Sequence, residues 1–409
     1  MRPICAFWLA AFAIGLAAPV HAEPFPFRRG IGLSHSMAWA QVAPPPSTAF
    51  VDPPFADRAL RDAELLAIRR AGFDFVRFAV DPGPFLHLDG ARRERLDRML
   101  LDQVGQILLA GLAVVVEFHP SDLHPHYTGR ALTAGPQTPV FQGYLRLLER
   151  TAALLDRLGS DRVGLELMNE PPGSTEAWQP MQDAAYRAAR RQAPRLPLVL
   201  TGGLDGMPEG LLTLRTEAFR NDPAVLYTFH YYEPFQFTHQ GAPWNAARYL
   251  ADVPYPATAR PLRDSLDATA AAIAAASLTP QQKLVAASDA WRHLESYRRS
   301  GFDRSAIARS LDRVVRWGRA NGVSPGRILL GEFGVRKSDR PPYGIRAAER
   351  RQWFADVRAE AEARGFIWAV WVYSGSGGFA LVEERGVNVE TAVTEALGLG
   401  PYRRGMPAN

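Results

Sequence analysis

The feature that most constrains the fold of this chain is a regular alternation of short apolar runs with segments that have helical spacing. Four of the intervening segments, among them ADRALRDAELLAIRRAG, repeat apolar residues at helical intervals and end at glycine, as helices often do. Near-continuous apolar strands alternating with amphipathic helices are typical of a parallel sheet that helices cover. Eight strand-like runs follow one another: RRGIGLSHSM, FDFVRFAV, LAVVVEFHP, VGLELMNEP, LPLVLTGG, VLYTFHYY, RILLGEFG and FIWAVWVYS.

Eight such units predict a single closed (β/α)8 barrel. An open, doubly wound sheet is the alternative, but its Gly-rich phosphate loop is missing, because RRGIGLSHSM has no G-x-G-x-x-G pattern. The spacing is uneven at residues 233–326, where the Ala-rich DSLDATAAAIAAASL and two further helical stretches separate the sixth and seventh strands. We expect an elaborated crossover there, with its early part over the barrel mouth, since the segment is too short for a domain with its own core.

The first residues have the pattern of a secretory signal peptide. Arg2 precedes an apolar stretch from Ile4 to Val20, and Val-His-Ala then predicts cleavage after Ala22. The domains would be a signal peptide at 1–22 and a barrel at 23–409. An uncleaved membrane anchor is the alternative, but the stretch is short and is interrupted by Gly15 and Pro19. We therefore expect a secreted protein, in a bacterium a periplasmic one, without membrane association after cleavage.

Cysteine and charge narrow the function classes. The one cysteine, Cys5, lies in the predicted signal peptide, so the mature chain has no thiol for a disulfide, a nucleophile or a metal. The formal net charge is +5, carried almost wholly by arginine, and the arginines are mixed with acids in stretches such as RRERLDRML. We interpret them as solvated helix faces, so no nucleic-acid partner is expected. We expect a monomer.

Polar residues gather at the carboxyl-terminal ends of the predicted strands, where barrels of this kind carry their working groups. Glu170 and Glu332 end the fourth and seventh strands, beside turn-forming Pro or Gly. Two carboxylates about 5 to 5.5 Å apart are what retaining hydrolysis of a glycoside requires, one as acid and one as nucleophile. The alternative is a structural ion pair with an inward arginine. Further polar or aromatic residues stand at the ends of the predicted strands, some on these two strands and some on others: Arg77, His119, Asn169, His230, Tyr232 and Trp371.

Position within the strands separates these residues from others nearby. Glu117 and Glu166 lie deeper, so we expect buried acids satisfied by a neighbour such as Arg77. Trp368 is expected in the core. Strand alternation would place Met168 and Glu170 on one face and Leu167 and Asn169 on the other, unless the turn rotates the last residues.

The motifs ELMNEP, FHYYEPFQFTH, LLGEFG and WAVWVYSG together resemble glycoside hydrolase family 5, the cellulase-like branch of the retaining β-glycosidases. The resemblance runs from about Gly30 to Leu397 and includes several motifs in the right order. It implies a β-linked glycan as substrate, Glu170 as acid/base, Glu332 as nucleophile, and neither cofactor nor metal.

The resemblance also implies supporting roles. Arg77 would hydrogen-bond the nucleophile and Tyr232 would orient it, while His230 would support the acid/base. Asn169 would hold the sugar 2-hydroxyl and His119 the sugar at the cleavage position. Trp371 would form the floor, because an aromatic face packs on the C–H face of a pyranose. Trp39, Trp178, Phe235 and Trp244 lie on predicted loops, where they would either bind further sugars or pack the loops.

Three other functions remain as alternatives. HPSDLHPHY gathers His119, Asp122, His124 and His126, as a metal hydrolase could, but the first strand has only the lone His35 where such barrels usually carry His-x-His. Inhibition by a chelator would distinguish a metal hydrolase from an enzyme that works through a pair of glutamates. A transglycosylase would use the same glutamates, and a non-catalytic carbohydrate-binding barrel would have no reason to keep both. The loops do not disclose linkage, and the roles of His124 and His126 stay open.

Overall fold

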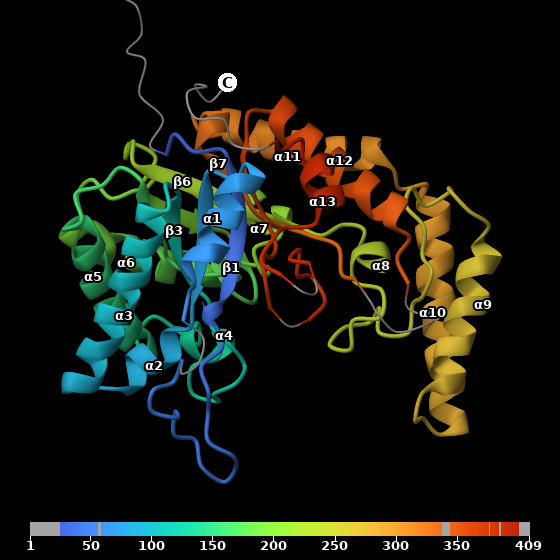
Figure 1. Ribbon diagram of the computed structural model, residues 1–409, viewed down its shortest axis with the longest axis horizontal. Coiled ribbons are helices and arrows are strands. Elements are labelled where there is room, and N and C mark those ends of the chain that lie inside the picture. Colours follow the sequence, from blue (N-terminus) through green and yellow to red (C-terminus); the bar gives the residue numbers. More distant parts are fainter. Residues whose placement is uncertain (1–24, 56–58, 338–343, 376, 384–385, 401–409) are drawn as a thin grey trace, which may run out of the picture.

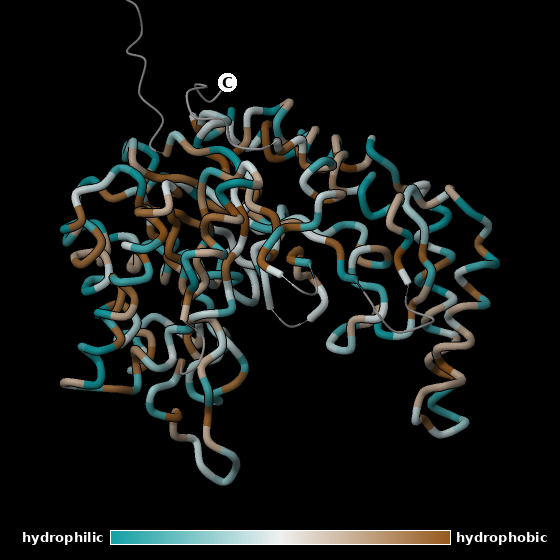
Figure 2. Tube along the Cα trace, in the orientation of Figure 1, coloured by the Kyte–Doolittle hydropathy of each residue, from teal (hydrophilic) through white to brown (hydrophobic). Residues whose placement is uncertain are grey.

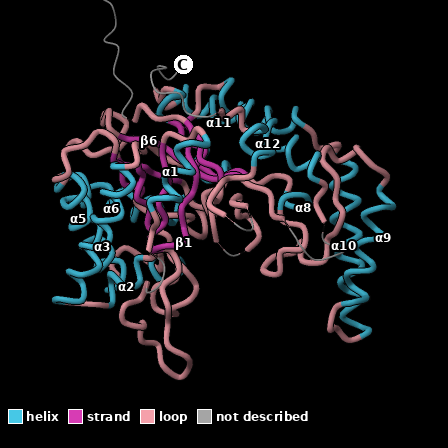
Figure 3. The backbone as a smooth tube through the Cα atoms, in the orientation of Figure 1, coloured by secondary structure: helices cyan, strands magenta, loops and turns pink. Residues whose placement is uncertain are grey.

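The chain folds into a closed barrel of eight parallel strands, in sequence order, with β1 hydrogen-bonded to β8. The computed structural model describes residues 25–55, 59–337, 344–375, 377–383 and 386–400. The predicted signal peptide lies outside these residues. The prediction of a single (β/α)8 barrel is confirmed (Figure 3). The strands are β1 (Arg29–Met37), β2 (Phe75–Val80), β3 (Ala113–Phe118), β4 (Val163–Glu166), β5 (Leu198–Thr201), β6 (Val225–Tyr231), β7 (Ile328–Phe333) and β8 (Ile367–Val370).

Helices surround the barrel (Figure 1). Side-chain caps fix several of their starts: the hydroxyls of Thr138 and Ser174 accept from backbone N–H groups of α5 and α6. The helices are α1 (Asp62–Ala71), α2 (Pro82–His87), α3 (Gly90–Leu109), α4 (Gly129–Leu132), α5 (Pro139–Asp156), α6 (Thr175–Gln192), α7 (Pro208–Leu212), α8 (Phe235–Thr238), α9 (Leu262–Ala275), α10 (Pro280–Ser300), α11 (Arg304–Ala320), the 3-10 turn η1 (Pro325–Arg327), α12 (Ala347–Ala363) and α13 (Thr391–Ala396).

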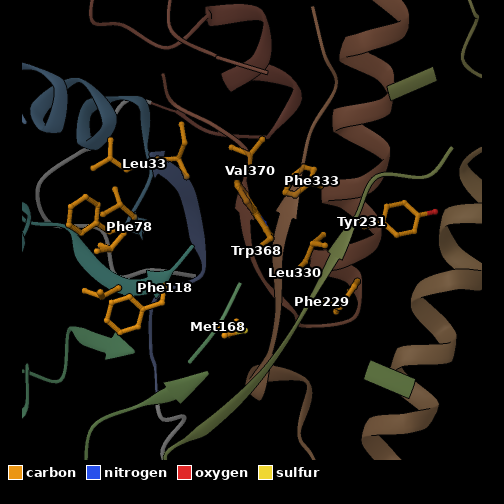
Figure 4. Packing of buried hydrophobic residues seen from close by; sticks show 14 of the residues in the cluster. Leu33, Phe78, Phe118, Met168, Phe229, Tyr231, Leu330, Phe333, Trp368 and Val370 are labelled. Carbon is orange, nitrogen blue, oxygen red and sulfur yellow. The ribbon is translucent and has the colours of Figure 1, made fainter. Parts of the chain in front are cut away.

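The core lies on both faces of the strands. Every residue of β2 and β3 is buried, which explains why these strands read as continuous apolar runs. One cluster fills the space between strands and helices, where Phe78, Phe333 and Trp368 pack (Figure 4). The brown apolar residues accordingly concentrate around the strands (Figure 2). Trp368 is fully buried, as predicted.

The crossover between β6 and β7 is elaborated, as predicted, and contains α8 to α11 and η1. α11 packs against α7 and α12, so it belongs to the helical layer of the barrel. α9 packs against α10, and α10 against α8, forming a hairpin that stands beside the barrel (Figure 1). Among the described residues, no helix is both long and apolar enough to cross a membrane.

Candidate active site

A buried arginine organises the carboxyl-terminal end of the barrel. Arg77 on β2 is completely buried, and its Nε and Nη2 donate to the two carboxylate oxygens of Glu166 at 2.8 and 2.7 Å. Nη1 donates to Glu332 Oε1 at 2.6 Å and lies 3.4 Å from Glu117 Oε1. Nη2 also donates to Asn169 Oδ1 at 2.8 Å. Glu117 and Glu166 are both buried, as expected. Arg77 hydrogen-bonds both oxygens of Glu166, whereas with Glu117 it forms only an ion pair, and Glu117 Oε2 has no hydrogen-bond partner among the described residues.

Replacing Arg77 by methionine is expected to lower the free energy of unfolding by about 3–5 kcal/mol, because it leaves buried carboxylates without their cation. Equilibrium unfolding in urea measures the change. Arg263→Met is the matched control, since Arg263 is exposed and its pair with Asp267 at 3.2 Å should be worth less than about 1 kcal/mol. Equal losses in the two variants would contradict the central role of Arg77.

Glu332, at the end of β7, has both carboxylate oxygens fixed by donors. Oε1 accepts from Arg77, and Oε2 accepts from the Tyr232 hydroxyl at 2.8 Å. Burial, reinforced by the negative charges of Glu332 and Glu170, raises the pKa of Tyr232 well above its usual value, so that Tyr232 remains a neutral donor. The Glu332 carboxylate is therefore held in one orientation at the barrel mouth.

Glu170 lies on the turn after β4, next to Pro171, with a φ of +43°. Its side chain is 37% exposed, and Oε1 lies 2.8 Å from His230 Nδ1 on β6. Although the side chain is partly exposed, the protein groups packed around it remove much of its hydration, and this desolvation raises the pKa of Glu170 to about 7; the positive charges of His119 and Arg77 oppose the shift. One oxygen of Glu170 lies within 4.8 Å of one oxygen of Glu332. The pair thus combines a fixed, hydrogen-bonded carboxylate with a carboxyl group that holds its proton near neutral pH.

The turn after β4 rotates the last residues, the exception allowed for above, so the simple alternation does not hold there. The strand ends at Glu166, and Met168 is buried in the core while Glu170 lines the pocket. Asn169 bonds to Arg77, so Asn169 and Glu170 contribute to the same site although they are neighbours in sequence. The physical reason is the positive φ of Glu170, which ends the extended conformation that alternation requires.

His119, just beyond β3, has its Nδ1 3.0 Å from Glu117 Oε1. Burial disfavours its charged form, but the negative charge of Glu117, the hydrogen bond to Glu117 and the charge of Glu332 together outweigh burial and raise the pKa of His119 to about 9. The imidazolium ring stacks on Trp371, with ring centroids 5.5 Å apart and planes at 8°. Trp371 fits closely over β1, where a Cβ on Gly32 would lie 2.6 Å from its ring. The pocket therefore has a cationic donor beside an aromatic wall.

These groups surround a pocket of about 310 Å³ at the barrel mouth. Of the residues predicted from sequence, His119, Glu170, Tyr232, Glu332 and Trp371 line it. Three others do not line the pocket but support it: Arg77 hydrogen-bonds Glu332, His230 hydrogen-bonds Glu170, and Asn169 hydrogen-bonds Arg77. The lining residues are Ser34, Trp39, His119, Glu170, Tyr232, His239, Trp244, Glu332, Trp371, Val372, Gly377 and Phe379.

The four predicted loop aromatics have different positions. Trp39 and Trp244 line the pocket. Phe235, 38% exposed, lies on α8 with its ring 4.8 Å from that of His239, a lining residue. The loop position predicted for Trp178 is wrong: it is 1% exposed within α6, and its Nε1 donates to Thr201 O at 3.1 Å. The reason is that Ser174 caps α6 earlier than expected and turns Trp178 inward, so Trp178 offers no surface to a sugar.

The histidines of HPSDLHPHY do not form one cluster. His119 pairs with Glu117, whereas His124 is buried and its ring lies 4.7 Å from that of Phe50. Two groups within the described part of the chain have a spacing that could hold a metal ion, and neither includes His124 or His126. They are Glu117, His119 and Glu332, and Glu170, His230 and Glu332. Both share Glu332, which Arg77 and Tyr232 already hydrogen-bond.

Sequence reasoning missed several residues of the pocket. His239 follows α8 and is buried, with its ring 5.1 Å from that of Tyr232 and 5.0 Å from that of Phe379. Burial and the charge of Arg336 lower the pKa of His239 to about 4, so it is a neutral group beside Tyr232. Its place in the loop after the sixth strand was an available signal. Ser34 and Phe379 stand in stretches whose sequence gives no comparable indication.

Comparisons with known proteins identify the family of this chain. The family model for cellulase, glycosyl hydrolase family 5, matches residues 56–377. Cellodextrinase A of Ruminococcus flavefaciens is 25% identical over 194 residues, which are 46% of this chain and 56% of that protein. Endoglucanase 3 of Fibrobacter succinogenes is 24% identical over 302 residues, 71% of this chain and 40% of that protein. The matches thus span about half of these relatives' own length.

Solved structures resemble the whole barrel. Endoglucanase Cel5A from Thermotoga maritima superposes with a TM-score of 0.64 at 19% identity, covering 92% of this chain and 100% of that one. A family 5 xyloglucanase from Paenibacillus pabuli has a TM-score of 0.66 at 15% identity, covering 91% and 98%. At these identities the likeness concerns the fold.

Proposed function

The chain belongs to glycosyl hydrolase family 5, the cellulase family, and is a hydrolase of O-glycosyl bonds; on this premise we propose that it cleaves a β-linked glucan by double displacement. Glu332 is the nucleophile and Glu170 the acid/base. The observation that carries the proposal is that both carboxyl groups face one pocket, with one oxygen of Glu170 within 4.8 Å of one oxygen of Glu332. So close an oxygen pair favours the short carboxyl separation of retaining enzymes, about 5–5.5 Å, over the about 6.5–9.5 Å that admits a water molecule in inverting enzymes.

In the first step, Glu170 gives its proton to the glycosidic oxygen as the bond between that oxygen and the anomeric carbon breaks. Glu332 attacks the same carbon and forms a glycosyl ester. Glu170, now a carboxylate, then takes a proton from water, whose oxygen displaces Glu332. The pKa of Glu170, raised by burial to about 7, suits both the acid and the base role near neutral pH.

The surrounding residues prepare these steps. Arg77 and Tyr232 keep Glu332 oriented for attack, and His230, 2.8 Å from Glu170, orients the acid. Asn169 is fixed through its Oδ1 by Arg77 and would donate an amide N–H to the sugar 2-hydroxyl. His119 donates to the sugar, and Trp371 packs against its C–H face.

A soluble β-1,4-glucan is the first substrate to test, with mannan second. Two relatives are called an endoglucanase and a cellodextrinase, and Thermotoga maritima Cel5A is described in complex with cellobiose and with mannotriose. We also propose secretion after cleavage at Ala22, which brings the enzyme to such polymers. Incubation of the mature chain with β-glucans and mannan, followed by mass spectrometry, should give shortened products from one polymer. Intact polymers throughout would contradict the proposal, and products longer than the substrate would indicate transglycosylation.

The pH profile should have an alkaline limb near pH 7. Only protonated Glu170 can act as acid, so kcat/KM should fall about tenfold per pH unit above the pKa of Glu170, about 7. This loss of activity should begin at a lower pH than the loss of charge on His119, because the pKa of His119 is raised to about 9. Rates on 4-nitrophenyl and 2,4-dinitrophenyl β-cellobioside test this. The limb should weaken for the dinitrophenyl leaving group, which needs no proton, and a flat profile to pH 9 with both would contradict the assignment.

A further inference from the structure

A groove separate from the catalytic pocket lies between α10 and the loop that follows α8. We propose that it is a second binding site for the same neutral glycan chain, an inference that rests on the proposed function. The groove has a volume of about 400 Å³. Its lining residues are Ala246, Arg248, Tyr249, Leu278, Gln281, Gln282, Val285, Ala286, Asp289, Ala290 and His293.

One short loop connects the groove to the catalytic pocket. Trp244 lines the pocket, and Ala246, Arg248 and Tyr249 line the groove. Five residues of chain span at most about 18 Å, a distance that a few sugar units cover. Two hydrogen bonds hold this loop in shape: Gly241 N–H donates to the backbone oxygen of Ala247 at 2.9 Å, and Ala247 N–H donates to the side-chain Oδ1 of Asn245 at 2.8 Å. A glycan leaving the pocket past Trp244 would therefore meet the groove on a fixed surface.

The chemistry of the lining suits a neutral polysaccharide. Tyr249, Val285 and Ala286 offer aromatic and aliphatic surface for the C–H faces of sugar rings. Planar polar side chains, among them Gln282 and Asp289, offer donors and acceptors for hydroxyl groups. The lining holds one arginine, Arg248, and one carboxylate, Asp289, which forms an ion pair with Arg292, so the groove has no cluster of like charges for a polyanion or a polycation.

The α9–α10 hairpin presents the groove on the correct side of the molecule. In Figure 1 it projects in the same direction as the loop that follows β1, which is the side where the strands end. The barrel does not need the hairpin for closure, because α11 completes the helical layer against α7 and α12. Leu284 and Trp291 on α10 are 67% and 49% exposed and do not line the groove. They provide an internal control.

Tyr249→Ala should lower the ratio of kcat/KM on hydroxyethylcellulose to kcat/KM on 4-nitrophenyl β-cellobioside by about tenfold, through KM on the polymer. Trp291→Ala, on the same helix as much of the groove, should leave the ratio unchanged. An unchanged ratio in Tyr249→Ala, or an equal fall in Trp291→Ala, would overturn the proposal; the second result would place polymer binding on the exposed face of α10 instead of in the groove.

Calorimetric binding separates the groove from catalysis. In the Glu332→Gln background, Tyr249→Ala should weaken binding of hydroxyethylcellulose about tenfold, and Trp291→Ala should not change it. Failure of the parent to hydrolyse any glycan would count against the proposed function, while this binding difference would still support the groove. Equal binding with and without the Tyr249 side chain would overturn the second site even in an active enzyme.

Discussion

Glu332→Gln is expected to lower kcat on a β-glucan by on the order of 10⁴-fold or more while binding of oligosaccharides remains measurable. Glutamine has nearly the same shape: its carbonyl oxygen can still accept from Arg77, and its NH2 group can donate to the hydroxyl oxygen of Tyr232, but the neutral amide cannot form the glycosyl ester. Initial rates on the polymer and calorimetric binding of cellotetraose measure the two parts of the prediction.

Tyr232→Phe is the control for Glu332→Gln, because it removes the 2.8 Å hydrogen bond but keeps the carboxylate. Its rate should fall by only about 10- to 100-fold. Parental activity in Glu332→Gln would remove Glu332 from the mechanism. Loss of folding, detected by circular dichroism, would instead assign Glu332 to the charge network of Arg77.

Glu170→Ala should lower kcat/KM by about 10²–10⁴-fold on substrates whose leaving group needs a proton. The loss should be much smaller on 2,4-dinitrophenyl β-cellobioside, because dinitrophenolate leaves without protonation. With that substrate the glycosyl ester should accumulate, since no base remains to activate water. Azide needs no base, so it should restore turnover and give a β-glycosyl azide detectable by NMR.

Glu233→Gln tests whether the effect is specific to Glu170. Glu233 also follows a strand at the barrel mouth, but it is outside the pocket lining. Its substitution should leave both substrates nearly unaffected, without azide activation. Equal losses on good and poor leaving groups in Glu170→Ala, with no azide product, would show that Glu170 is not the acid/base.

The barrel could be predicted from sequence because parallel strands covered by helices are apolar on both faces. β2 and β3 are buried at every position, so their apolar runs can be recognised in the sequence without knowing which strands lie beside them. The carboxyl-terminal ends of β4 and β7 then indicated Glu170 and Glu332, because strand direction fixes the end of the barrel to which they belong.

Other parts of the site depend on backbone detail that apolar patterning does not encode. The positive φ of Glu170 brings Asn169 and Glu170 into one site, and the early start of α6 turns Trp178 into the core. His239 reaches Tyr232 only because the short helix α8 folds back after β6. The groove beside α10 likewise arises from packing between segments separated by about thirty residues or more, which no local motif marks.

Trapping the covalent intermediate tests the central claim most directly. The mature enzyme would be incubated with 2,4-dinitrophenyl 2-deoxy-2-fluoro-β-cellobioside, whose fluorine slows both steps while the good leaving group keeps the first step accessible. Peptide mass spectrometry should find one fluorocellobiosyl group, attached to Glu332. A label on another residue, or rapid release of an inverted product without any labelled peptide, would contradict the assignment of Glu332 as the nucleophile.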